Sequence, residues 1–199
     1  MPITRPAAAL LAGLAFLPLI QPAAAADIAV PMPGNTARKV TLYHASAALA
    51  VGIGATANVE NAQVLAQGLK ERGYNARSIA SIDGVNLRDL VREFLAKDGV
   101  NPDSRLLLWF SGLTQMAEAL PLDELAAMLN MAAARHILVV LDGCSESPAF
   151  RWSEPVAGAV DWPALLPGRQ VLAHCGSDPR LFRERFLTLL SGTSPADTN

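Results

Sequence analysis

Two cysteines and three histidines are the side chains of this chain best suited to nucleophilic or acid–base chemistry. The cysteines are Cys144 and Cys175, and the histidines are His44, His136 and His174. Cys144 follows the apolar run HILVVL, and His174 ends the run RQVLAH. A thiol next to an imidazole can act as a nucleophile with its base, whereas two thiols in an oxidising compartment can form a disulfide.

The composition excludes several classes of protein. Two cysteines in 199 residues cannot build the framework of a Cys-rich secreted domain or a zinc site of four cysteines. The 16 basic and 18 acidic residues leave no basic excess for a phosphate backbone, so we expect no nucleic-acid partner. With 51% hydrophobic and 17% charged residues, the chain is apolar enough for one packed domain.

Residues 1–26 have the features of an export signal. Arg5 is their single charge, an apolar run extends from Ala7 to Ile20, and small residues suited to cleavage follow it. The run is shorter than the ~20 residues of a membrane-spanning helix. We expect a signal peptide, a periplasmic or secreted protein, and no stable membrane span after cleavage. A retained N-terminal anchor has the same first two features and stays open as the alternative.

The remaining chain alternates between apolar strand-like runs and helical periodicity, which is typical of a parallel sheet covered by helices. We therefore expect an α/β fold with a mainly parallel sheet of about five strands and helices on both faces. An extended leader over residues 27–37 would precede a single domain over residues 38–192 and a disordered tail over residues 193–199. The predicted strands cover residues 38–44, 75–82, 104–110, 136–141 and 169–174, and the predicted helices cover residues 61–72, 86–98, a segment opened by Pro121, and 179–190.

In such sheets, ligands and catalytic groups gather at the carboxyl ends of the strands. The segments of interest are therefore those at and just after the strand ends: His44–Ser46, Ser111–Leu113, Asp142–Ser145 and His174–Ser177.

The two most apolar strands carry a resemblance to a known family. LLLWFSGL and HILVVLDGCSES resemble the catalytic strand ends of the caspase/metacaspase-like cysteine peptidases, in particular the bacterial members. One strand of that family ends in Gly-His-Gly, which supplies the base, and the next ends in Asp-x-Cys, which supplies the nucleophile. RKVTLYHAS, NAQVLAQGLKERGY, PLDELAAML and RQVLAHCGSD resemble further family elements, so the resemblance covers nearly all of residues 38–192. It implies a caspase-like three-layer fold.

The resemblance makes Cys144 the nucleophile and Asp142 a residue that helps to receive a basic substrate side chain. The base is not carried over, because Leu113 stands where the family has His, and a Leu cannot accept the thiol proton. Asn61 stands where an Asp is usual, and Ala45 stands where the first strand normally ends in Gly. The loop after Leu113 is also shorter than usual. Several site positions thus depart from the family together.

Three arrangements of Cys144 remain open. His174 ends the neighbouring strand and could replace the lost base, because adjacent strands lie about 4.8 Å apart. Cys175 could instead form a disulfide with Cys144, or both thiols could be inert. Consecutive strand side chains point to opposite faces, so only one of His174 and Cys175 can readily meet Cys144.

Other candidate residues favour structural roles. Gly52, Gly54 and Ala57 match the spacing of a dinucleotide fingerprint, but the acidic residue expected about 20 positions later is missing. We therefore predict a flexible Gly-rich loop there and no cofactor. His44 and His136 are predicted to be structural, with His136 at the end of the sheet away from the crevice.

From these observations we expect an exported pseudo-peptidase that keeps the caspase-like fold and acts by binding a protein or peptide. The alternative is an active cysteine endopeptidase that cleaves after Arg or Lys. Cys144 would be its nucleophile, His174 its substitute base and Asp142 its substrate-binding acid. No metal is expected in either case, and the oligomeric state stays open.

Overall fold

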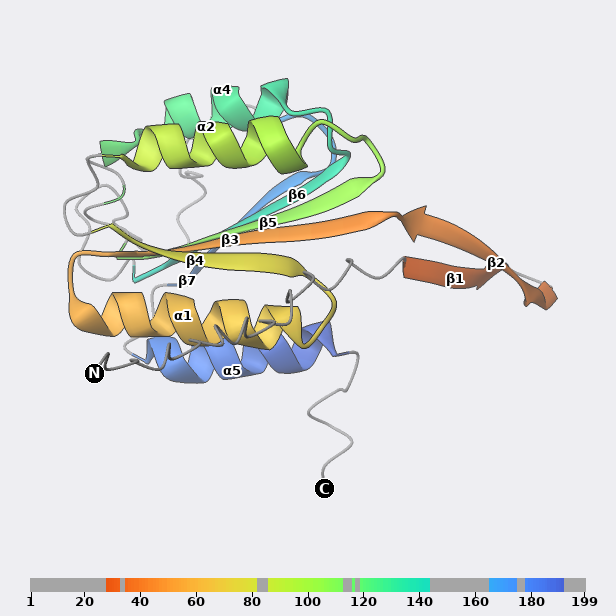
Figure 1. The fold of residues 1–199 in the computed structure, drawn as a ribbon, viewed down its shortest axis with the longest axis horizontal. Coiled ribbons are helices and arrows are strands. Elements are labelled where there is room, and N and C mark those ends of the chain that lie inside the picture. Colours follow the sequence, from red (N-terminus) through yellow and green to blue (C-terminus); the bar gives the residue numbers. More distant parts are fainter. Residues whose placement is uncertain are drawn as a thin grey trace, which may run out of the picture.

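The computed structural model describes residues 28–32, 35–81, 86–112, 116, 119–143, 165–174 and 178–191. In these residues a five-stranded parallel sheet lies between two layers of helices (Figure 1). The strand order is β4-β3-β5-β6-β7. The strands are β3 Ala45–Ile53, β4 Asn75–Ser81, β5 Ser104–Ser111, β6 His136–Asp142 and β7 Arg169–His174. The predicted α/β architecture is confirmed.

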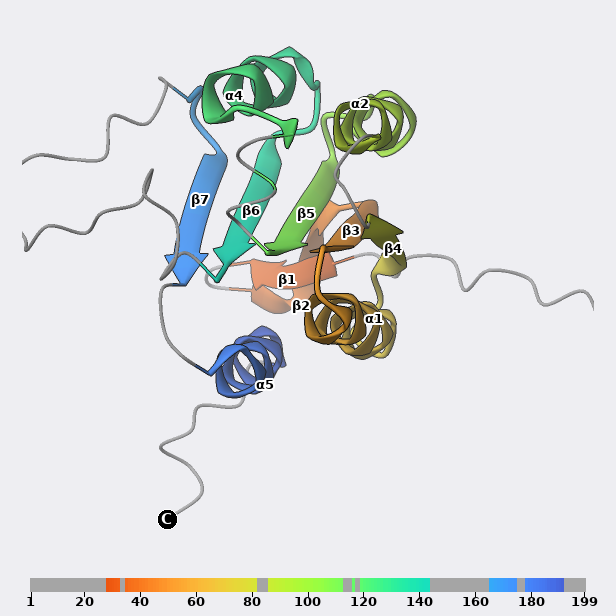
Figure 2. The same cartoon turned by 90° about the vertical axis from the view of Figure 1, so that its left-hand side faces the viewer.

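In the described part of the chain, helices cover both faces of the sheet (Figures 1 and 2). Helices α2 (Leu87–Asp98) and α4 (Leu122–Met131) lie on one face, and α1 (Thr56–Lys70) and α5 (Pro179–Leu190) lie on the other. No helix in the described part of the chain is long and apolar enough to cross a membrane.

The central strands contribute side chains to both layers. In β5, Leu106 and Leu108 belong to the core beneath α2 and α4, whereas Leu107 and Trp109 belong to the core beneath α1 and α5. This alternation follows from the period of two along a strand. A strand buried on both faces needs apolar side chains at consecutive positions, which explains the continuous apolar runs in the sequence.

The central strand β3 departs most from the sequence-based prediction. Residues 45–53 were expected to belong to a Gly- and Ala-rich loop, but they form a strand that pairs with β4 on one side and β5 on the other. Its side chains from Ala47 to Val51 are at most 5% exposed. Alanine and glycine are depleted in strands generally, so the composition masked this strand. Burial between two helical layers overrides that preference here.

The expected first strand, residues 38–44, lies outside the main sheet. These residues fall largely in β2 (Asn35–Tyr43), which pairs antiparallel with β1 (Ile28–Met32) in a separate hairpin. Part of the predicted leader, residues 27–37, is therefore paired strand. The hairpin projects from the amino end of the sheet, opposite the carboxyl ends of the strands (Figure 1).

His44 lies at the edge opposite the one predicted. It follows β2 and precedes β3, and its N–H donates to the carbonyl of Asp103 at 3.1 Å. The prediction that His44 ends a sheet strand at the crevice is wrong, because the strand was assigned one element too early. His136 begins β6 at this same amino edge, as predicted, and its Nδ1 lies 3.0 Å from the hydroxyl of Tyr43.

The expected flexible loop around Gly52 and Gly54 is instead a tight junction between β3 and α1. A Cβ on Gly52 would lie 2.4 Å from the Cα of Val59, so only glycine allows α1 to pack this closely on the strand. Gly54 has a φ of +74°, a left-handed conformation that other residues adopt at a cost. Both glycines thus have a structural explanation in the fold.

Gly52→Ala is expected to destabilise the domain by about 1–3 kcal/mol, because its methyl group would meet helix backbone that cannot rotate away. Gly68→Ala is the matched control. Its Cβ would meet the end of the Leu187 side chain at 2.6 Å, which can change rotamer, and alanine favours the helix by about 1 kcal/mol. Urea unfolding of both variants measures the difference. Equal stability of the two variants would contradict this account of the junction.

Candidate functional site

The site lies at the carboxyl ends of β5, β6 and β7, beside the point where the chain changes its direction across the sheet. From β3 the chain first adds β4 on one side and then continues to β5 on the other. Such a switch point is the usual place for a crevice in an open α/β sheet. Ser111, Asp142 and His174 end β5, β6 and β7, and the sheet register places them side by side. Figure 2 views the sheet from this end.

Asp142 and His174 form a hydrogen-bonded pair. The Nδ1 of His174 lies 2.8 Å from Oδ1 of Asp142. The aspartate side chain is 1% exposed and the histidine side chain 19%. A carboxylate can only accept, so when Asp142 is ionised Nδ1 carries the proton and Nε2 holds the free lone pair of the neutral ring. No described residue is hydrogen-bonded to Nε2.

Aromatic packing fixes the orientation of the His174 ring. Phe182 of α5 stacks on it with ring centroids 4.1 Å apart and an interplanar angle of 7°. Phe182 in turn stacks on Trp109 of β5, with centroids 5.3 Å apart. The imidazole is therefore held by a hydrogen bond at one edge and by a flat contact on one face.

Asn61 donates a hydrogen bond to the second carboxylate oxygen of Asp142. Its Nδ2 donates to Oδ2 of Asp142 at 3.0 Å and to Oγ of Ser111 at 2.9 Å. Its Oδ1 accepts a hydrogen bond from Nη1 of Arg183 at 2.6 Å. Both carboxylate oxygens of Asp142 are thus engaged by the chain itself, and Asn61 relays the contact to a cation.

Helix α5 supplies the cation of this network. The side chain of Arg183 is 12% exposed, and its buried Nε has no hydrogen-bond partner among the described residues. The hydroxyl of Ser111 accepts a further hydrogen bond from Nε1 of Trp109 at 3.0 Å. The polar network therefore ties α1, three strands and α5 together at one end of the sheet.

Burial raises the pKa of Asp142 above its ordinary value of 3.8. The hydrogen bonds from His174 and Asn61 and the charge of Arg183 act in the opposite direction and offset only part of this effect. The carboxyl group consequently takes up a proton more readily in the folded chain than in the unfolded chain.

Two of the predicted site residues are brought together, namely Asp142 and His174. Cys144, Cys175 and Leu113 lie outside the described residues, so the Cys–His dyad and the disulfide both remain predictions. In the part of the chain that the structure describes, no three His, Cys, Asp or Glu side chains are grouped to hold a metal ion.

Sequence reasoning missed the roles of Asn61 and Arg183. Asn61 was noted only as a departure from the family pattern. One signal was present in the sequence, because Asn61 lies in phase with Leu65 and Leu69 on the buried side of α1. A polar side chain on an apolar stripe indicates a buried hydrogen-bond partner. Arg183 has the same signal, because it lies in phase with Leu187 and Leu190 of α5.

Comparison of the chain with protein-family models, with curated proteins and with solved structures finds no significant match.

Asp142→Asn is expected to change how stability depends on pH. Because the folded pKa of Asp142 is raised, its protonation stabilises the wild type fully below pH 3.8, and this contribution is lost as the pH rises through the folded pKa. The stability of the wild type relative to Asp142→Asn should therefore fall over that window. Urea unfolding at a series of pH values measures the difference, and the surface variant Asp123→Asn serves as control. A relative stability that rises over the window would show that the folded pKa is lowered.

Proposed function

We propose that this protein is an exported caspase-like pseudo-peptidase that acts by binding a protein or peptide. Its α/β sheet carries Asp142 at the carboxyl end of β6, in the position that the resemblance gives to the substrate-binding acid. The resemblance also places Leu113 where the base would be. The proposal depends above all on the surroundings of Asp142.

The carboxylate of Asp142 is closed to a substrate. A basic substrate side chain would need access to a carboxylate oxygen, but His174 lies against Oδ1 and Asn61 against Oδ2. With the side chain 1% exposed, an incoming guanidinium would have to displace at least one of these partners. Leaving a buried polar group without its hydrogen bond costs about 1–3 kcal/mol. The burial of Asp142 and its hydrogen bonds to His174 and Asn61 are the observation that supports a binding protein over a peptidase.

Exposed residues around the carboxyl end of the sheet, here called the crevice rim, offer a binding surface. Ala57 in the first turn of α1 and Arg180 in the first turn of α5 are both exposed at this end of the sheet. The polar network beneath them links both helices to the strand ends through Asn61 and Arg183. A surface held in this way is preorganised, which lowers the entropic cost of binding an extended peptide.

The Asp142–His174 pair favours the second candidate, an active cysteine peptidase. A carboxylate at 2.8 Å from Nδ1 orients a histidine as in the Ser-His-Asp arrangement. Nε2 of His174 would take the thiol proton of Cys144, the thiolate would attack the substrate carbonyl, and the imidazolium would return the proton to the leaving amine. In this role Asp142 orients the base, so a different group would have to receive a basic substrate side chain.

A covalent probe separates the two candidates. The purified mature protein is incubated with a peptidyl acyloxymethyl ketone carrying Arg next to the reactive group, and intact mass is measured. We expect no adduct at Cys144, because the base position holds a leucine and Asp142 is occupied. A stoichiometric adduct that is lost in Cys144→Ser and in His174→Ala would establish the peptidase instead. A quantitative Cys144–Cys175 disulfide in the untreated protein would exclude the peptidase.

Site-specific photo-crosslinking tests the binding role. A benzoylphenylalanine at position 57 or 180 lies on the crevice rim, whereas the same residue at position 70 lies at the far end of α1. Irradiation of the producing cells should give an adduct of one discrete mass from positions 57 and 180 and none from position 70. Adducts that are absent at the rim, or that are identical at all three positions, would refute binding at the crevice.

A further inference from the structure

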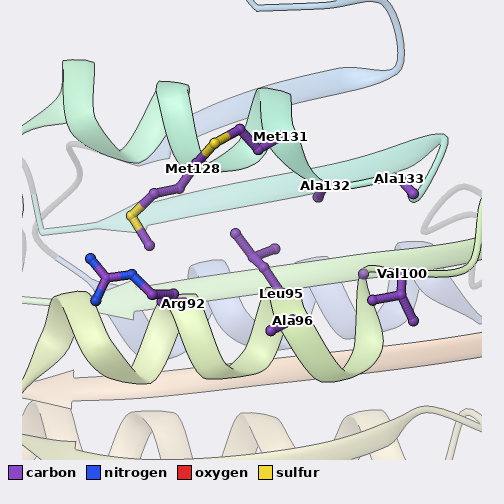
Figure 3. A pocket seen from close by; sticks show the side chains of 9 residues that line it. Arg92, Leu95, Ala96, Val100, Met128, Met131, Ala132 and Ala133 are labelled. Carbon is purple, nitrogen blue, oxygen red and sulfur yellow. The ribbon is translucent and has the colours of Figure 1, made fainter.

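A cavity of about 390 Å³ lies between α2 and α4, on the face of the sheet opposite the polar network (Figure 3). The two helices are joined near their amino ends, where Arg88 donates to Glu124 at 2.7 Å. Toward their carboxyl ends the cavity opens between them. Its volume lies within the range of about 300–1,000 Å³ that is usual for small-molecule sites.

The floor of this cavity is core and its mouth is exposed apolar surface. Leu95 and Met128 are 7% and 6% exposed and belong to the main hydrophobic core. Val100 and Met131 line the same cavity but are 63% and 80% exposed. Methionine side chains adapt their shape to a ligand more readily than branched ones. Covering this apolar surface would be favourable at about 25 cal/mol per Å².

The two ends of the cavity differ in charge. Arg92 lies at one end, and Val100 and Ala133 lie at the other (Figure 3). The guanidinium of Arg92 is oriented by Asp89 through Nη1 at 2.8 Å. Helices α2 and α4 both end near the opposite end of the cavity, where their dipoles place partial negative charge. Arg92 is the charged residue of the lining, so an anionic group is favoured at its end of the cavity.

We propose that this cavity binds a small anionic amphiphile, such as a medium-chain carboxylate. The hydrocarbon chain lies against Leu95 and Met128, and the carboxylate contacts the guanidinium edge of Arg92 that Asp89 does not occupy. Val100 and Met131 then cover the chain at the mouth. This site is independent of the proposed function, because it uses the other helical layer and none of the crevice residues.

Calorimetric titration with sodium octanoate and with octan-1-ol tests the site. Octanoate should bind the mature protein saturably with one site per chain. Ala96→Trp fills the cavity from an exposed position of α2 and should weaken binding of both compounds at least tenfold. Ala127→Trp makes the same change at an exposed position of α4 outside the cavity and should leave binding unchanged.

Arg92→Gln tests the head group and guards against misfolding of the tryptophan variant. It should weaken octanoate binding about fivefold, as expected for a partly exposed ion pair, and leave octanol binding unchanged. Absence of saturable octanoate binding would overturn the proposal. Octanoate binding that persists in Ala96→Trp would also overturn it. So would an Arg92→Gln variant that binds octanoate as the wild type does, as a purely apolar site would. An Arg92→Gln variant that loses octanoate and octanol equally would likewise overturn the proposal, because the loss would then not depend on the head group.

Discussion

A carboxylate buried at the end of a central strand has to obtain its hydrogen bonds from the protein itself, because water does not reach it. Asp142 meets this requirement with His174 on one oxygen and Asn61 on the other. Each partner then needs support of its own. His174 is held against Phe182, and Asn61 accepts a hydrogen bond from Arg183. The hydrogen bonds around this one side chain thus connect α1 and α5 to the strand ends, in addition to their apolar packing on the sheet.

The hydrogen bonding of Asp142 also limits the chemistry that this residue and His174 can perform. An acid that is fully hydrogen-bonded within its own chain is a stable structural centre and a poor receptor for a substrate cation. An imidazole held by that acid is, in contrast, correctly oriented for proton transfer. The contacts of Asp142 thus disfavour its use as a receptor for a substrate cation, as in the proposed pseudo-peptidase, while His174 retains the orientation of a base. The cavity beside α2 and α4, in contrast, is lined mainly by apolar side chains.

The fold was predictable where burial leaves a simple pattern. The apolar runs of β5 and β6 and the helical periodicity of α2 gave nearly correct boundaries. The pattern failed for β3, because a strand pressed between two helical layers can use alanine and glycine, which resemble a loop in composition. It failed again for β2, whose alternation is that of a hairpin outside the main sheet.

The site was predictable only in part for a different physical reason. Asp142 and His174 could be placed on neighbouring strand ends, because parallel strands align their carboxyl ends. Which atoms meet depends on sheet register and side-chain direction, and the hydrogen bond between Asp142 and Nδ1 of His174 was not predicted. A polar residue on an apolar stripe marks Asn61 and Arg183 as buried, but which partners they meet depends on how two distant helices pack, which no local pattern encodes.

The hydrogen bond between Asn61 and Arg183 joins residues that are 122 positions apart in the chain. Closing so long a segment is entropically costly, so the contact is favourable only once the intervening strands are in place. The acid at the end of β6 obtains its hydrogen bonds from β7 and α1, but Asn61 obtains its own partner, Arg183, only when α5 docks. The complete polar network therefore depends on the docking of the last helix.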